Sequence, residues 1–238
     1  MKINLVSSPR NRSTLLMYAF AQRADTRVVD EPYYAHYLSQ SEVTHPGHAE
    51  VMAAQANDIQ SAHHELLKAP GEHLFIKNMA HHYREADFKY LLDFTNILYI
   101  RNPRAIIRSY SKVINSPTVD DVGIQQVERI FNFLKTNGQR ILVLDSDALV
   151  TNPEKVLRSL CRALTIPFDK AMLSWEPGPK PYDGVWANYW YHNVHNSTGF
   201  KPKDHAGEEY ALPQTLEALA VRCMPAYETL KQHSLTIE

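Results

Sequence analysis

The chain has few cysteines, a nearly balanced charge and no long apolar run, and each shortage excludes a class of protein. Two cysteines in 238 residues are too few for a disulfide scaffold and favour a reduced, cytoplasmic protein. The 25 Lys and Arg nearly cancel the 26 Asp and Glu, so we expect no nucleic-acid partner. No apolar run approaches the ~20 residues of a membrane span. Residues 1–8 are too short and polar for a signal peptide and are expected to form a strand.

Short apolar runs alternate with helical patterns along the chain. The runs predict buried strands at residues 3–6, 28–29, 74–76, 97–100 and 141–144. Helices are expected from about Ser13, over residues 50–67, after Pro103 in a first turn, and up to Gly138. Continuous apolar strands between amphipathic helices are typical of a sheet covered on both faces. We therefore predict one domain over residues 1–238, a three-layer α/β fold with a mostly parallel sheet of about five strands.

The segment at about residues 174–204 differs from the rest of the chain. It contains all three tryptophans, several tyrosines, and several prolines and glycines. We expect an ordered, loop-rich layer there. Its aromatic residues could line an acceptor pocket, stack on an adenine ring or simply belong to the core, and the sequence leaves these alternatives open.

The connection between the first strand and the first helix carries an anion-binding pattern. It reads Ser7-Ser8-Pro9-Arg10-Asn11-Arg12-Ser13-Thr14. Backbone N–H groups at a helix N-terminus bind anions, and hydroxyl and guanidinium groups strengthen such a site. The glycines and the Gly-Lys-Ser/Thr ending of the Walker loop are missing. The alternative is an ordinary connection in which Ser13 or Thr14 caps the helix.

A second anion-binding pattern follows the fourth predicted strand. Arg101 ends that strand, and Ser109 lies on the next helix, 109 − 101 = 8 residues later. Ligands of parallel sheets bind beyond the carboxyl ends of the strands. Both side chains can therefore face one anion at the same edge as the first loop.

Together these segments resemble the sulfotransferases that use 3′-phosphoadenosine 5′-phosphosulfate (PAPS). Residues 9–14 are similar to the Pro-Arg-Ser-Gly-Ser/Thr-Thr loop that holds the 5′-phosphosulfate, and Arg101 and Ser109 match the residues that hold the 3′-phosphate. Residues 144–168 resemble the strand, loop and helix after the family's Glu-Asp-Leu element. The resemblance implies a P-loop NTPase-like fold and transfer of a sulfuryl group from PAPS to a hydroxyl or amine of a small-molecule acceptor. The product is adenosine 3′,5′-bisphosphate (PAP).

The resemblance also assigns the residues that bind the donor. They are Arg10, Asn11, Arg12, Ser13, Thr14, Arg101 and Ser109, with Lys201 added because the family has a basic loop near the C-terminus. Arg12 departs from the family, which usually has Gly there, so it could add an anion contact or partly fill the site. Residues 183–200 resemble a bacterial and plant branch, some members of which are fused to aminotransferase-like domains.

Sulfuryl transfer needs a base that removes the acceptor's proton and a cation that stabilises the developing negative charge. Arg10 suits the second task. Glu31 ends the second strand 31 − 10 = 21 residues after Arg10, which resembles branches whose base is a Glu at similar separation. His81 and His82, after the third strand, are the rival bases, because imidazole titrates near neutral pH. The alternative for Glu31 is an exposed turn carboxylate. Lys77 is expected to neutralise charge or to form a surface salt bridge.

Other functions stay open at this point. A small-molecule kinase would need a Mg²⁺-binding carboxylate, for which Asp145 or Asp147 could serve. A non-catalytic nucleotide-binding module would keep the fold without the chemistry. We expect no metal, because His63-His64-Glu65 and His81-His82 lack the spacing of a zinc site. Nothing in the sequence favours one oligomeric state.

Overall fold

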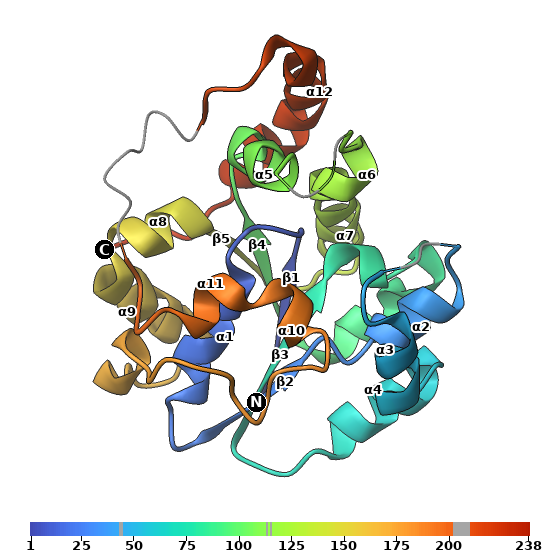
Figure 1. The fold of residues 1–238 in the computed structure, drawn as a ribbon. Helices are drawn as coiled ribbons and strands as arrows, with labels where there is room; N and C mark the ends of the chain where they lie inside the picture. The colour runs from blue at the N-terminus through green and yellow to red at the C-terminus, as the bar shows by residue number, and fades with distance from the viewer. Residues whose placement is uncertain (43–44, 113, 115, 202–209) are drawn as a thin grey trace.

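The computed structural model describes residues 1–42, 45–112, 114, 116–201 and 210–238. Its sheet has five strands in the order β2-β3-β1-β4-β5 (Figure 1). Their bounds are Lys2–Ser7 (β1), Thr26–Asp30 (β2), His73–Met79 (β3), Thr95–Ile100 (β4) and Ile141–Asp145 (β5). Every pairing between these strands is parallel, which confirms the predicted sheet.

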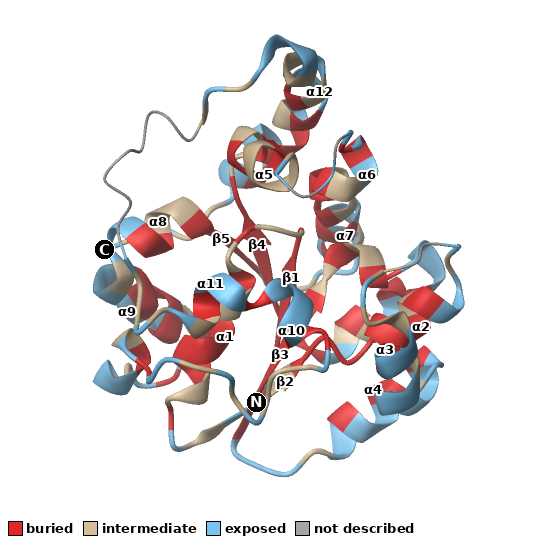
Figure 2. Cartoon of the chain, in the orientation of Figure 1, coloured by how far each residue is buried: buried red, intermediate tan, exposed pale blue. Residues whose placement is uncertain are grey.

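Helices cover both faces of the sheet, and this explains why the strands are continuous apolar runs. Successive strand residues point to opposite faces. Ile3 and Leu5 pack with α1 (Ser13–Ala21) and α9 (Pro153–Leu164). Val6 packs on the other face, which α7 (Ile124–Thr136) and α12 (Gln214–Lys231) cover. The strands are accordingly buried in the middle layer of the predicted three-layer fold (Figure 2).

The remaining elements are short. They are α2 (Tyr34–Ser39), α3 (His48–Ala54), α4 (Ile59–Lys68), η1 (Ala80–His82), η2 (Glu85–Asp93), α5 (Pro103–Tyr110), α6 (Val119–Val122), α8 (Ser146–Thr151), η3 (Lys170–Leu173), α10 (Ala187–Trp190) and α11 (His192–His195). Pro103 occupies the first turn of α5, and Gly138, at φ 66°, follows the end of α7, both as predicted. No helix in the described part of the chain is long and apolar enough to cross a membrane.

The helix predicted over residues 50–67 is wrong, because two helices stand there. Gln55 leaves the helical region at φ −132° and ψ 159°. Its side chain accepts a hydrogen bond from the Ala35 N–H and donates one to the Glu31 carbonyl, both at 3.0 Å. Asp58 then caps α4 by accepting from the Ser61 N–H at 2.8 Å. The predicted helix is therefore interrupted at Gln55, where the side chain bonds to the backbone of Glu31 and Ala35. The C-terminal helix α12 was not predicted at all.

A buried polar network joins the three central strands on one face. The Asn4 Nδ2 donates to Asn96 Oδ1 at 3.0 Å, and the Asn78 Nδ2 donates to Asn4 Oδ1 at 3.1 Å. The Tyr83 hydroxyl accepts from both Asn4 and Asn78. A buried network of side-chain hydrogen bonds favours one arrangement of the strands. It therefore ties β3, β1 and β4 together, from Asn96 near the start of β4 to Asn78 near the end of β3.

Candidate active site

The residues singled out in the sequence gather where the five strands end. Ser7, the last residue of β1, lies beside Met79 of β3 and Tyr99 of β4, so the loop after β1 is central. Asp30 pairs in register with Lys77 on one side of that loop. On the other side Ile100 pairs with Asp145. The residues of the candidate site therefore lie side by side along the carboxyl ends of the strands, the edge of the sheet that carries the site, with the β1–α1 loop in the middle.

The β1–α1 loop has an unusual backbone. Arg10 and Arg12 have φ of 59° and 66°, in the left-handed region that non-glycine residues rarely adopt. The loop is fixed in this form from β4, because Asn11 Nδ2 donates to the Tyr99 carbonyl and an Arg101 guanidinium N–H donates to the Arg10 carbonyl at 2.7 Å. Strain that is held in place by its surroundings is common at functional sites.

Arg12 adopts the conformation that suits the family's usual glycine. It precedes α1 as its N-cap residue, and its side chain makes no capping hydrogen bond. The N–H groups in the first turn of a helix have no partner within the helix. Ser13, which is buried, and Thr14, which is half-buried, lie in that first turn. The start of α1 is thus arranged to receive an anion.

Three of the predicted donor-binding residues meet at this loop. The Arg10 Nε donates to the Ser109 hydroxyl at 3.2 Å, and Arg101 holds the Arg10 carbonyl. Burial, with the nearby Arg12, lowers the pKa of Arg101 to about 10, so it stays cationic at neutral pH. The structure therefore brings Arg10, Arg101 and Ser109 together. Lys201 is exposed and directly precedes residues 202–209, which lie outside the described part of the chain.

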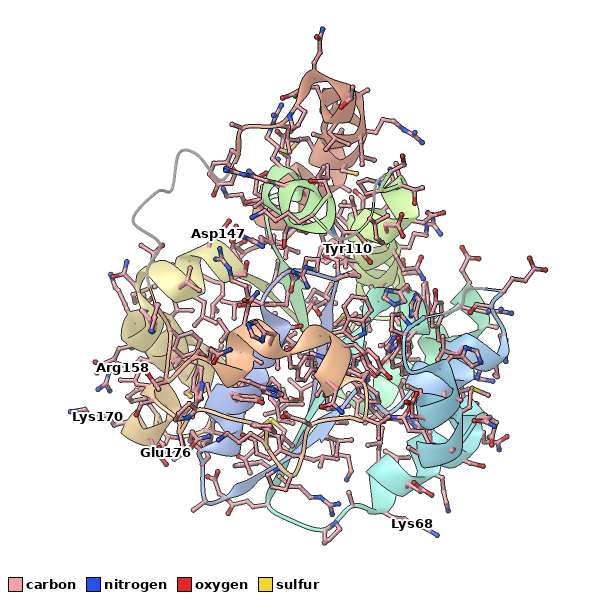
Figure 3. The ribbon with its side chains drawn as sticks, viewed as in Figure 1. Lys68, Tyr110, Asp147, Arg158, Lys170 and Glu176 are labelled. Carbon is pink, nitrogen blue, oxygen red and sulfur yellow. The ribbon has the colours of Figure 1, made fainter. Side chains whose placement is uncertain are left out.

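Asp147 is a member of the site that sequence reasoning considered only for Mg²⁺. Its Oδ1 lies 3.0 Å from the Arg12 Nη1 and 3.7 Å from the Arg101 Nε. The Tyr210 hydroxyl donates to its Oδ2 at 3.2 Å. One carboxylate from α8 thus offsets the repulsion between two arginines. Figure 3 shows Asp147 and, across the loop in this view, Tyr110 at the end of α5.

Several buried polar atoms near the loop have no hydrogen-bond partner among the residues that the structure describes. They are the Ser8 Oγ, Asn11 Oδ1, Tyr99 hydroxyl and Ser146 Oγ. Leaving such an atom unsatisfied costs about 1–3 kcal/mol. Polar atoms of this kind are expected where a polar ligand binds. With the cationic side chains beside them, they fit a phosphorylated donor.

A buried carboxylate lies at the neighbouring strand end. The Lys77 Nζ donates to Glu31 Oε1 and, at 3.0 Å, to Asp30 Oδ1. The side chains of Lys77, Asp30 and Glu31 are only 0%, 1% and 6% exposed. Glu31 is therefore not an exposed turn residue, and Lys77 is not on the surface. The backbone of Glu31 has a φ of 41°, and Gln55 and Tyr34 bind its carbonyl.

The pKa values of Glu31, His81 and His82 are shifted in opposite directions by their burial. Burial raises the pKa of Glu31 to about 7, Asp30 adds to the rise, and the Lys77 ammonium opposes it. Burial also lowers the pKa of His81 to about 3 and that of His82 well below its usual value. A base works best with a pKa near the operating pH. Glu31 meets that condition, whereas both histidines stay neutral and weakly basic.

Aromatic rings surround Glu31 on the side away from Lys77. This ring cluster consists of Tyr34, Tyr37, His45, His81 and His82. The His82 Nε2 lies 3.6 Å from Glu31 Oε2, and its ring stacks on Tyr34 with centroids 5.0 Å apart. Tyr37 contacts His81, and the Tyr34 hydroxyl lies 2.7 Å from His45 Nδ1. Sequence reasoning missed Tyr34, Tyr37 and His45, although Tyr34 and Tyr37 lie at helical i, i+3 spacing just after Glu31.

The aromatic segment folds over these strand ends as an ordered layer. Its ends are joined by a bridge between Ser174 and Gly199. Trp175 and Trp186 are buried, whereas Trp190 is 36% exposed. Trp186 and Tyr191 pack in the core beside β2 and β3. Most of the aromatic side chains therefore serve as core, which was one of the alternatives.

A parallel sheet with helices on both faces and a strand–loop–helix connection at its centre is typical of the P-loop-like α/β fold. The family model described as "Sulfotransferase domain" matches residues 1–234. The chain therefore belongs to this sulfotransferase family. Within the described residues, no three His, Cys, Asp or Glu side chains gather to hold a metal ion.

The chain is also similar to curated proteins and to solved structures. "Branched-chain-amino-acid aminotransferase-like protein 2" of Arabidopsis thaliana is 35% identical over 97% of this chain. The chain spans only 41% of the length of the curated relatives it matches. The solved sulfotransferase domain from the curacin biosynthetic pathway has a TM-score of 0.63 at 18% identity and covers 95% of this chain and 96% of its own. A mouse sulfotransferase complexed with PAP has a TM-score of 0.55 at 13% identity, covering 98% of this chain and 89% of its own. Both structures share the fold.

Proposed function

We propose that this protein transfers a sulfuryl group from PAPS to a hydroxyl or amine of a small acceptor and releases PAP. The observation that carries the proposal is the placement of two unlike sites on one sheet edge. Arg10, Arg101 and Ser109 form a cationic donor site around the β1–α1 loop. Glu31, with a pKa of about 7, lies at a strand end on the other side of β3. Membership of the sulfotransferase family supports PAPS as the donor.

The donor site supplies binding and electrostatic stabilisation. PAPS would bring the activated sulfuryl group. The first turn of α1 and Arg10 would bind its 5′ end, as in the family motif, while Arg101 and Ser109 would bind its 3′-phosphate. Guanidinium groups form strong, directional hydrogen bonds to such oxygens. Donors that are already in position stabilise developing charge without reorganising.

Glu31 would remove the proton of the acceptor. Its ionised form is the one that accepts a proton, and a pKa of about 7 leaves about half of it ionised at neutral pH. The ring cluster beside it is uncharged at that pH, because burial lowers the pKa of His45, His81 and His82. Aromatic rings with polar tips suit a small organic acceptor that carries a hydroxyl or amine.

The two acidic residues that a kinase could use to bind Mg²⁺, Asp145 and Asp147, are already hydrogen-bonded within the protein. This makes a kinase the less well supported alternative. Asp145 accepts hydrogen bonds from the Asp147 N–H and the Tyr227 hydroxyl, both at 2.8 Å. Asp147 is engaged by Arg12 and Tyr210. Each carboxylate thus has a structural task within the protein. A Mg²⁺ ion would have to displace these partners to be bound there.

Calorimetric titration with PAP tests the proposal, with adenosine 5′-monophosphate and Mg²⁺·ATP as comparison ligands. We expect PAP to bind at least tenfold more tightly than either comparison ligand, because Arg101 and Ser109 contribute only when a 3′-phosphate is present. A preference for Mg²⁺·ATP, or no binding of PAP, would overturn it. Binding of PAP without PAP release from PAPS, across a panel of hydroxyl and amine acceptors, would favour a non-catalytic module.

A further inference from the structure

A single hydroxyl of the aromatic segment reaches into the buried charge cluster beside Glu31. The Tyr191 hydroxyl lies 2.8 Å from the Lys77 Nζ and 2.7 and 2.9 Å from the two Asp30 oxygens. The Trp186 Nε1 donates to the same hydroxyl at 3.3 Å, and the Gly184 N–H donates to Asp30 Oδ2 at 3.1 Å. Asp30 therefore receives two donors from this segment in addition to Lys77.

The cluster contains more negative than positive charge. Two carboxylates, Asp30 and Glu31, share the one ammonium of Lys77. A buried charge is stable only when it is paired and hydrogen-bonded. Asp30 has three donors, namely Lys77, the Tyr191 hydroxyl and the Gly184 N–H, whereas Glu31 has Lys77 and the same Tyr191 hydroxyl. His82 from η1 and Tyr34 from α2 also face Glu31, and both are neutral at pH 7.

From this asymmetry we propose that Tyr191 and Asp30 are positioning residues for the base. By binding both Asp30 and Lys77, Tyr191 holds that carboxylate against the ammonium and so sets how much of the pairing with Lys77 is left to Glu31. Through Asp30, which is 161 positions away in the chain, Tyr191 thus adjusts the acid–base chemistry of Glu31. This inference rests on the proposed role of Glu31 as the base.

Two substitutions are expected to move the proton affinity of Glu31 in opposite directions. Asp30→Asn removes the second carboxylate, so Lys77 pairs with Glu31 alone and the pKa of Glu31 falls. Tyr191→Phe removes a donor from the cluster, so Asp30 draws more strongly on Lys77 and the pKa of Glu31 rises. Each change is expected to be about one pH unit, the usual effect of losing or gaining one charged or hydrogen-bonding neighbour.

The test is a carbon NMR titration of the full chain labelled at the glutamate carboxyl carbons. The Glu31 resonance is identified by its absence in Glu31→Gln. We expect a midpoint near pH 7 in the unsubstituted protein, a lower one in Asp30→Asn and a higher one in Tyr191→Phe. Tyr189→Phe is the matched control, because its hydroxyl donates to the exposed Glu50 at 3.1 Å and should leave the midpoint unchanged.

Three results would overturn the inference: a Glu31 midpoint below pH 5, unchanged midpoints in both variants, or shifts of the same sign. Thermal unfolding shows whether each variant is folded. If only one of them folds, that variant alone still gives the direction in which the Glu31 midpoint shifts. The titration needs no acceptor. If the midpoints move as expected but Glu31→Gln retains full turnover, the coupling stands and the proposed role of Glu31 fails.

Discussion

The two ends of the sheet edge differ in the sign of their charge. Around the β1–α1 loop, Arg10, Arg12 and Arg101 outnumber Asp147. At the ends of β2 and β3, Asp30 and Glu31 outnumber Lys77. The chain as a whole has a net charge of only −1, so overall composition conceals a local separation of charge. The excess of cations at one end favours binding of an anion, whereas at the other end burial, with the second carboxylate of Asp30, raises the pKa of Glu31.

The two ends also differ in how they are held. The donor loop is anchored to β4 through backbone carbonyls, those of Tyr99 and Arg10. The base is anchored through side chains and through Gln55, which binds the Glu31 carbonyl. We therefore expect substitutions at the donor end to change ligand binding and those at the base end to change the rate and its pH dependence. The predictions below test that division.

The largest effect is expected for Glu31→Gln. The amide keeps the shape of the side chain but cannot accept the acceptor's proton, and general bases commonly contribute ~100-fold to 10,000-fold. Turnover is measured as PAP release from PAPS with an acceptor found by screening, and PAP affinity by calorimetry. We expect turnover to fall at least ~100-fold with PAP affinity within about threefold. Glu50→Gln, on the exposed face of α3, is the control. A loss of PAP binding in Glu31→Gln would contradict the assignment of ligand binding to the donor end and of the rate to the base end.

Arg101→Ala should have the next largest effect, and on binding. It removes the proposed charge-assisted contact to the 3′-phosphate and the hydrogen bond that holds the Arg10 carbonyl. Such contacts are worth about 1.5–3 kcal/mol, or roughly 10-fold to 150-fold in PAP affinity. Arg104→Ala is the matched control, because Arg104 lies in the first turn of α5 and pairs with Glu217. Equal losses of affinity in both variants would contradict the assignment of Arg101 to the donor site.

The pH dependence follows from the raised pKa of Glu31. The protonated carboxyl is inactive as a base, so kcat/KM should rise about tenfold per pH unit below pH 7 and level off above it. His81→Gln should leave the midpoint in place, because His81, with a pKa of about 3, is already neutral across that range. A midpoint that disappears in His81→Gln would identify the histidine as the titrating group.

The sequence predicted the sheet well because the information for it is local. Each strand is a run of residues such as Ile97 and Leu98 that is buried on both faces, and each is bounded by polar or helix-starting residues. The sequence also indicated that Arg10, Arg101 and Ser109 would lie close together, because Arg10 lies in the loop after β1, Arg101 directly follows β4, and Ser109 lies on the helix that comes next. Ligand sites of parallel sheets lie at those positions. The role of these three residues in binding the donor stays a prediction.

The surroundings of Glu31 were not predicted, because they depend on contacts between distant parts of the chain. Lys77 gave no sign of complete burial, since lysine is rarely buried unless it is paired. Its partner Tyr191 is 114 residues away. Gln55, at the end of α3, donates a hydrogen bond to the carbonyl of Glu31, 24 residues earlier. No periodicity reports such pairings, whereas the spacing of Tyr34 and Tyr37 could have indicated the ring cluster.

The smallest effects are expected for substitutions of Arg12, at the donor end of the sheet. Because its φ is 66°, Arg12→Gly relieves about 1 kcal/mol of backbone strain while it removes an ion pair with a partly exposed Asp147. We expect the free energy of unfolding to change by no more than about 1 kcal/mol, and to fall further in Arg12→Ala, which keeps the strain and loses the pair. Chemical denaturation measures both values.

The same variants show whether Arg12 acts on the donor. Asp147 already neutralises its guanidinium, so we expect Arg12→Gly to change PAP affinity less than tenfold, well below the effect of Arg101→Ala. Asp147→Asn is the complementary variant. It frees both arginines from their shared carboxylate, and PAP should then bind more tightly and with a steeper dependence on salt. Weaker PAP binding in Asp147→Asn would mean that the carboxylate aligns the arginines for the donor rather than merely offsetting their charge.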